Sequence, residues 1–173
     1  MKKQKILPII LAVWPYLILL LPLMKGDILM KLFVYGYMAG TAVVYIMNII
    51  NAFRYKSETA AKDLAFYNMV IKAVHIPFYL AVFGIGLIFI LASVVPALIF
   101  FSPFVVITLF TVDIFLMFTS SMYGVSAIIK AAAEGTISKK SAVKNAIMHF
   151  VFVLDIISAV NVYKKIKSVN KDV

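Results

Sequence analysis

Five ionisable side chains lie inside long apolar stretches of the sequence, where each charge needs a physical reason. In chain order they are Lys72, His75, Asp113, His149 and Asp155. A charged side chain in a bilayer costs about 2.5–3.5 kcal/mol on insertion scales, and carboxylates and imidazoles in such places often bind ions or relay protons. We therefore treat these residues as candidates for cation binding or proton relay, with Asp113 ranked first because its place in its stretch puts it near the middle of the membrane.

Polar and small residues also recur at helical spacing in three of the apolar stretches, so each stretch presents one polar face. On the functional interpretation the three faces converge on a cavity in which Asp113, His75 and Asp155 act together. By stretch, the residues are Asn68, Lys72, His75, Tyr79 and Gly86; Gly36, Gly40, Asn48 and Asn51; and Asp113, Ser120 and Gly124.

The same faces have an alternative interpretation as helix packing. Small residues let helices approach closely, and interhelical bonds from asparagine contribute only about 0.6 kcal/mol each. On this interpretation Lys72 extends to the headgroups, and His75 bonds Asp113 in a purely structural contact. The candidate packing residues are Gly36, Gly40, Gly86 and Gly124.

Composition places these residues in a membrane. Of the 173 residues, 64% are hydrophobic, and the mean hydropathy is +1.05. A soluble domain averages about 45–50% apolar residues and cannot bury so large a share. The formal net charge is +10, but the charges cluster in short stretches between apolar runs, which indicates membrane flanks and not nucleic-acid binding.

Four apolar runs reach the length of about 20 residues that a transmembrane helix needs. A fifth, Ala146 to Val162, is at the lower limit for spanning and has no clean polar face. We expect one all-α domain over residues 1–173: an integral membrane protein with four transmembrane helices and a fifth membrane-embedded C-terminal helix, which either spans or is re-entrant. The expected helices cover about 6–24, 28–53, 64–94, 104–129 and 139–163, and Ser138 is the expected N-cap of the last.

The positions of Lys and Arg predict a cytoplasmic N-terminus, because cytoplasmic loops carry the excess of positive charge. Basic residues flank the start of the chain, the second connection and the end of the fourth helix, whereas the opposite side has only Lys25 and Lys31. If the last helix turns back, its C-terminal lysines obey the same rule. If it crosses, they violate it.

The sequence gives no sign of an enzyme or of a cofactor. Cysteine is absent, which excludes disulfides, thiolate metal sites and cysteine nucleophiles. Zinc-protease, hydrolase, phosphate-loop and dinucleotide motifs are also missing, so we predict no catalytic residues, no metal and no cofactor.

Three stretches carry a resemblance to known proteins. Lys72–Tyr79, Thr119–Gly124 and Asp155–Ala159 resemble segments of small uncharacterised multi-span membrane proteins of low-GC Gram-positive bacteria. The resemblance covers roughly the last hundred residues and implies a bacterial plasma membrane but no activity.

Three classes of function remain open. The first is a non-enzymatic transport-related or accessory subunit with a polar intramembrane site, associated with another membrane protein or with copies of itself. The second is an interaction protein, such as a self-immunity or envelope-stress factor. The third, an intramembrane enzyme using Asp113 or Asp155, ranks last because no motif supports it.

Overall fold

The computed structural model describes residues 2–169, and all regular structure in that range is helical. Four segments are long and apolar enough to span a membrane: Gln4–Leu23, Asp27–Arg54, Ala60–Ala92 and Phe101–Ala133. The prediction of four such helices is confirmed. The elements are α1 (Lys2–Val13), the 3₁₀ helix η1 (Trp14–Leu23), α2 (Asp27–Arg54), α3 (Ala60–Ala92), α4 (Phe101–Ala133), α5 (Lys139–Met148) and α6 (Leu154–Val169).

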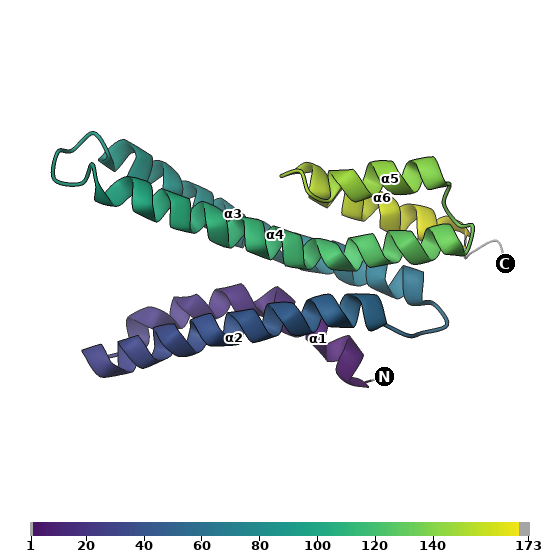
Figure 1. The fold of residues 1–173 in the computed structure, drawn as a ribbon, viewed down its shortest axis with the longest axis horizontal. Helices are drawn as coiled ribbons and strands as arrows, with labels where there is room; N and C mark the ends of the chain where they lie inside the picture. Colours follow the sequence, from purple (N-terminus) through teal and green to yellow (C-terminus); the bar gives the residue numbers. More distant parts are fainter. Residues whose placement is uncertain (1, 170–173) are drawn as a thin grey trace.

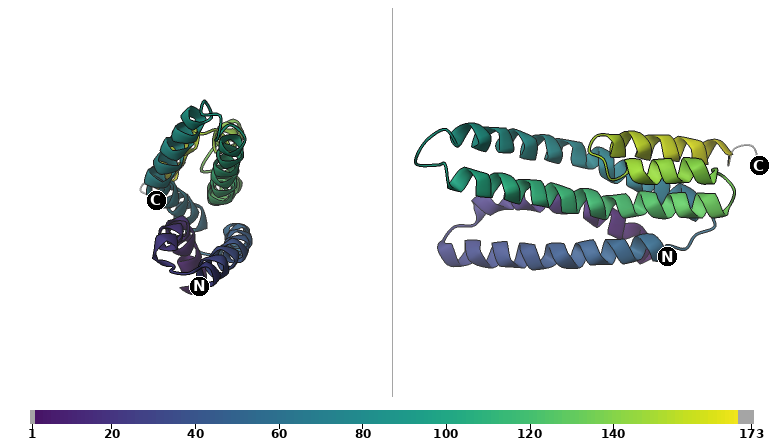
Figure 2. Two further views of the ribbon diagram at one scale, coloured as in Figure 1. Left: turned by 90° about the vertical axis from the view of Figure 1, so that its left-hand side faces the viewer. Right: turned by 45° about the horizontal axis from the view of Figure 1, so that its top comes forward.

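The helices form three layers of antiparallel pairs (Figure 1). α1 and η1 run back along α2, α3 and α4 run side by side, and α5 and α6 cover α3 and α4 on the face away from α2 (Figure 2). The α5–α6 pair is much shorter than α3 and α4. We call the covered part of α3 and α4 the closed half, and the part beyond the tip of α5–α6 the open half.

The first apolar run is not one regular helix, because it changes from α to 3₁₀ geometry at Trp14. Prolines cause local strain here, since each lacks the amide that would bond the carbonyl four residues earlier. Side chains from other helices replace those missing donors. Asn51 Nδ2 donates to the Gln4 carbonyl at 3.0 Å, opposite Pro8, and His75 Nε2 donates to the Leu11 carbonyl at 3.2 Å, opposite Pro15.

The prediction of one continuous C-terminal helix over 139–163 is wrong. α5 ends at Met148, the chain turns through residues 149–153, and α6 returns antiparallel to α5 (Figure 1). The turn contains Val153 at φ 69°, a conformation that β-branched residues rarely adopt. Ser138 does cap α5, as predicted, because its hydroxyl accepts a bond from the Ser141 amide.

Reversal of the chain is stabilised by polar contacts that a straight helix would not make. The Ser158 hydroxyl donates to the Asn145 carbonyl at 3.1 Å, and Lys165 Nζ donates to Ser141 Oγ at 3.0 Å. Both bonds join α5 to α6. No glycine or proline marks the turn in the sequence, which is why periodicity alone did not reveal it.

The tip of the α5–α6 hairpin lies at the middle of the long helices. The Phe152 ring contacts the Tyr79 ring of α3 with centroids 5.4 Å apart, and the Phe150 ring lies 5.7 Å from that of Phe118 in α4. The opposite end of the hairpin lies with the 55–59 connection, at the lysine-rich end of the bundle (Figure 1). The 24–26 connection, whose sequence includes Lys25, and the uncharged 93–100 connection lie at the other end.

Candidate functional site

The closed half contains a buried ion pair between α3 and the hairpin. Lys72 Nζ lies 2.6 Å from Asp155 Oδ2, and the two side chains are 0% and 4% exposed. Lys72 Nζ also donates to Ser121 Oγ at 2.9 Å and lies 3.4 Å from the Met117 carbonyl. Because the lysine has several acceptors, it does not reach the headgroups, and it joins α3, α4 and α6 at one point.

Ser121 extends this network to the hairpin turn. Its hydroxyl accepts the bond from Lys72 and donates to the His149 carbonyl at 2.7 Å. The turn is therefore tied to α4 through its backbone and to α3 through Asp155. Ser121 was not among the residues predicted for the site, although its position between Met117 and Gly124 on one face of α4 was a usable signal.

His149 and Asn68 pack tightly against Gly124. A Cβ at Gly124 would lie 2.5 Å from His149 Nε2 and 2.8 Å from Asn68 Nδ2, so a larger residue here would displace these two buried side chains. Both side chains are buried, and among the described residues neither His149 nitrogen and neither Asn68 side-chain atom has a hydrogen-bond partner. The predicted polar residues of α3 thus face the interior, alongside His149.

Glycines divide into two groups in the structure. Gly40 is in close contact with Trp14, whose Cζ2 would lie 2.8 Å from a Cβ, while Gly124 contacts the hairpin as described. A Cβ at Gly36 or Gly86 would meet no atom within 4 Å. Two of the four predicted packing glycines therefore make close interhelical contacts within this chain.

His75 forms no hydrogen bond with Asp113 or Asp155. It is fully buried, and its Nε2 bonds the Leu11 carbonyl that Pro15 leaves free. The hypothesis of a His75–Asp113 bond is wrong, and the three residues Asp113, His75 and Asp155 do not form one hydrogen-bonded centre among residues 2–169.

α4 also bonds α2 through a second polar network that needs no ionisable group. Tyr123 Oη donates to Asn48 Oδ1 at 2.7 Å and accepts from Asn51 Nδ2 at 3.0 Å. The Ser126 hydroxyl donates to the Ala52 carbonyl at 2.7 Å. These satisfied bonds make the asparagine stripe of α2 a packing contact, which is the alternative that the sequence left open.

Asp113 lies in a different environment from Asp155. It is 7% exposed, and its Oδ1 is buried without a hydrogen-bond partner among the described residues. It lies in the open half, in a groove of about 310 Å³ between α3 and α4. The other residues that line the groove are apolar: Val82, Phe83, Gly86, Leu87, Ile90, Val106, Leu109, Phe110 and Phe152.

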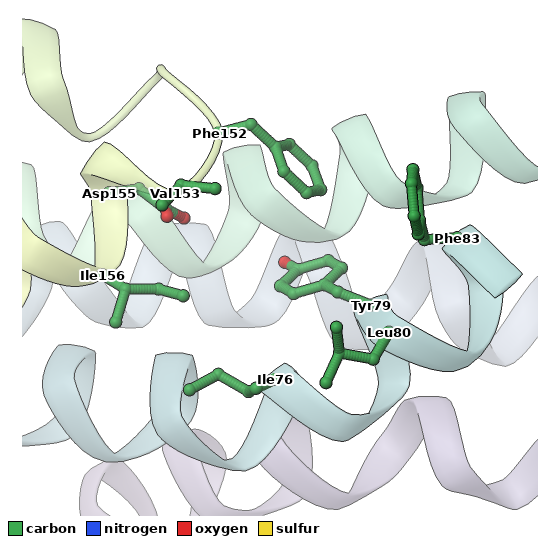
Figure 3. A pocket seen from close by; sticks show the side chains of 8 residues that line it. All are labelled: Ile76, Tyr79, Leu80, Phe83, Phe152, Val153, Asp155 and Ile156. Carbon is green, nitrogen blue, oxygen red and sulfur yellow. The ribbon is translucent and has the colours of Figure 1, made fainter.

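A second cavity of about 300 Å³ adjoins this groove at the hairpin tip, since Phe83 and Phe152 line both. Figure 3 shows the Tyr79 ring below Phe152, with its hydroxyl end on the side of Asp155. That hydroxyl is buried and has no partner in the described part of the chain. Apolar walls with few polar groups are typical of small-molecule sites.

No group of three His, Asp or Glu side chains within residues 2–169 is placed to hold a metal ion.

The comparisons with known proteins give a family but no activity. No curated protein and no solved structure matches the chain. The model of one family matches residues 4–168, nearly the whole chain, and the protein therefore belongs to the family of unknown function DUF6652.

Proposed function

We propose that the protein is a non-enzymatic multi-span membrane protein that serves as a transport-related accessory subunit, with Asp113 as its polar intramembrane site. The observation that carries the proposal is the buried, unpartnered Oδ1 of Asp113 in an otherwise apolar groove. An unpaired carboxylate in such surroundings is unfavourable. A cation or hydrogen-bond donor from outside the chain would supply the partner that this carboxylate lacks.

The short connections between the long helices support the accessory role. Among residues 2–169 these connections cover residues 24–26, 55–59 and 93–100. Segments of this length are too small to fold into a soluble domain of their own. We therefore assign the coupling of transport to an associated protein, which is another membrane protein or further copies of this chain.

The hairpin is re-entrant in this proposal, entering the bilayer and returning on the same side. Support comes from its apolar tip at mid-helix depth and from the lysine-rich end of α6, which lies with the 55–59 connection, flanked by Arg54 and Lys62. By the positive-inside rule this end is cytoplasmic, so the N-terminus is also cytoplasmic. A bacterial plasma membrane is the location that the sequence resemblance implies.

Gentle purification from the native membrane tests the accessory role. Mass analysis of the intact assembly should show a defined protein partner or a defined homo-oligomer. That assembly is then reconstituted in vesicles, and cation and proton flux are compared between wild type, Asp113→Asn and the exposed control Asp27→Asn.

Loss of flux in Asp113→Asn alone is the expected result. Flux that persists unchanged in this variant would overturn the assignment of Asp113 as the site. Resistance to a membrane-active peptide on expression, with no flux in any variant, would instead place the protein among interaction proteins of the self-immunity type.

A further inference from the structure

The Asp113 groove combines one charged group with several aromatic faces. Phe83 from α3, Phe110 from α4 and Phe152 from the hairpin tip all line it, and each is exposed to some degree. Aromatic faces attract cations, most strongly where water is excluded. A single carboxylate among aromatic rings is thus complementary to a positive charge carried on an apolar body.

The groove also has room for such a body. Its volume of about 310 Å³ lies at the lower end of the range of about 300–1,000 Å³ for ligand pockets. A Cβ on Gly86, one of the lining residues, would meet no atom within 4 Å, so the glycine leaves space inside the groove. The adjoining cavity beyond Phe83 and Phe152 adds about 300 Å³.

The chemistry of the lining does not suit a divalent metal ion, an anion or a neutral acyl chain. A calcium ion takes 6–8 oxygen ligands and a magnesium ion about six, whereas among the described residues that line the groove only Asp113 has a polar side chain. An anion would be repelled by the carboxylate. A neutral acyl chain would fill the groove but would leave Asp113 Oδ1 without a partner.

We propose that the groove between α3 and α4 binds a lipophilic organic cation that enters laterally from the bilayer. The apolar body packs on Phe83, Phe110 and Phe152, and the cationic centre lies against the Asp113 carboxylate. The space at Gly86 sets the size of ligand that is accepted. This inference rests on the proposed function, because it names the ligand class of the same site.

Binding of radiolabelled tetraphenylphosphonium to the purified full-length chain in detergent tests the proposal. Wild type should bind the probe saturably, and the detergent alone serves as the blank. Asp113→Asn should bind at least about tenfold more weakly, which corresponds to about 1.4 kcal/mol. Asp113→Glu should retain part of the affinity, and Asp27→Asn, which changes an exposed carboxylate that does not line the groove, should bind like wild type.

Gly86→Leu provides an independent variant that keeps the carboxylate and fills the groove. It should weaken binding of the bulky probe while leaving the folded state intact, which size-exclusion elution and circular dichroism check for every variant. Equal binding by wild type, Asp113→Asn and Gly86→Leu would overturn the proposal.

The two proposals fail in distinguishable ways. If the probe does not bind but the reconstituted assembly still loses flux in Asp113→Asn, the site stands and the ligand class is wrong. If neither probe binding nor flux depends on Asp113, both the ligand class and the proposed function are wrong.

Discussion

Two buried carboxylates in the same helical bundle have opposite environments, because one has a charged partner and the other has none among the described residues. In the closed half, Asp155 has a lysine at 2.6 Å, and the hairpin that carries it is bonded to α4 through Ser121. In the open half, Asp113 has a buried oxygen without a partner and a lining of apolar side chains. Both residues are nearly fully buried.

The difference indicates what each residue is for. A buried pair with good geometry and further hydrogen bonds offsets the cost of desolvation and fixes how the segments pack. Asp155 therefore serves to position the hairpin. An unpaired carboxylate contributes nothing comparable to folding, and this is why we propose a binding role for Asp113.

Breaking the Lys72–Asp155 pair should produce the largest effect. Lys72→Met leaves the Asp155 charge buried and uncompensated, which costs about 3–5 kcal/mol. We expect a large fall in the thermal unfolding temperature in detergent and faster proteolysis of the hairpin. The double variant Lys72→Met/Asp155→Leu should recover most of this loss, and a double variant no more stable than the single one would contradict the structural role of the pair.

Gly124→Ala should be the next most damaging change. The added methyl group would lie 2.5 Å from His149 Nε2, so the buried His149 side chain at the start of the hairpin turn must shift, and overpacking of this kind costs about 1–3 kcal/mol. Proteolysis should then cut the 149–153 turn more readily. Gly36→Ala, where no atom lies within 4 Å, is the matched control and should leave the rate of cleavage unchanged.

His75 gives a prediction that separates structure from proton relay. His75→Leu leaves the buried Leu11 carbonyl without its donor, at a cost of about 1–3 kcal/mol. Pro15→Ala returns a backbone amide four residues after Leu11, so the double variant should be less destabilised than the sum of the two single variants. If the losses of stability in the two single variants simply added in the double variant, His75 would not be the substitute for the amide that Pro15 lacks.

Asp113→Asn should have the smallest effect on stability. The sign of that effect tests the difference between Asp113 and Asp155. Because no group in the described chain pairs with the buried oxygen, neutralising the carboxylate should leave the unfolding temperature unchanged or raise it slightly. Asp155→Asn measured in parallel should lower it strongly. A large destabilisation by Asp113→Asn would show that this residue, too, has a structural partner.

Much of the fold was predictable because bilayer solvation leaves few choices. Four apolar runs of sufficient length had to be helices, and the structure confirms them. Helical spacing also placed Asn68, Lys72 and His75 on one buried face of α3. These inferences depend only on local periodicity.

Partners across helices were not predictable in this way. Spacing cannot show that Lys72 pairs with Asp155, that His75 replaces the donor lost at Pro15, or that Asp113 remains alone. Helix rotation and order follow from packing, which the sequence of a single helix does not contain.

The C-terminal hairpin shows most clearly which features the sequence could not predict. The sequence by itself determined that residues 146–162 are apolar, helical in preference and at the lower length limit for a span. Only the tertiary structure decided that the chain turns back at 149–153, because the turn carries no glycine or proline signal. It is stabilised instead by Lys72, Ser121 and Gly124 on other helices.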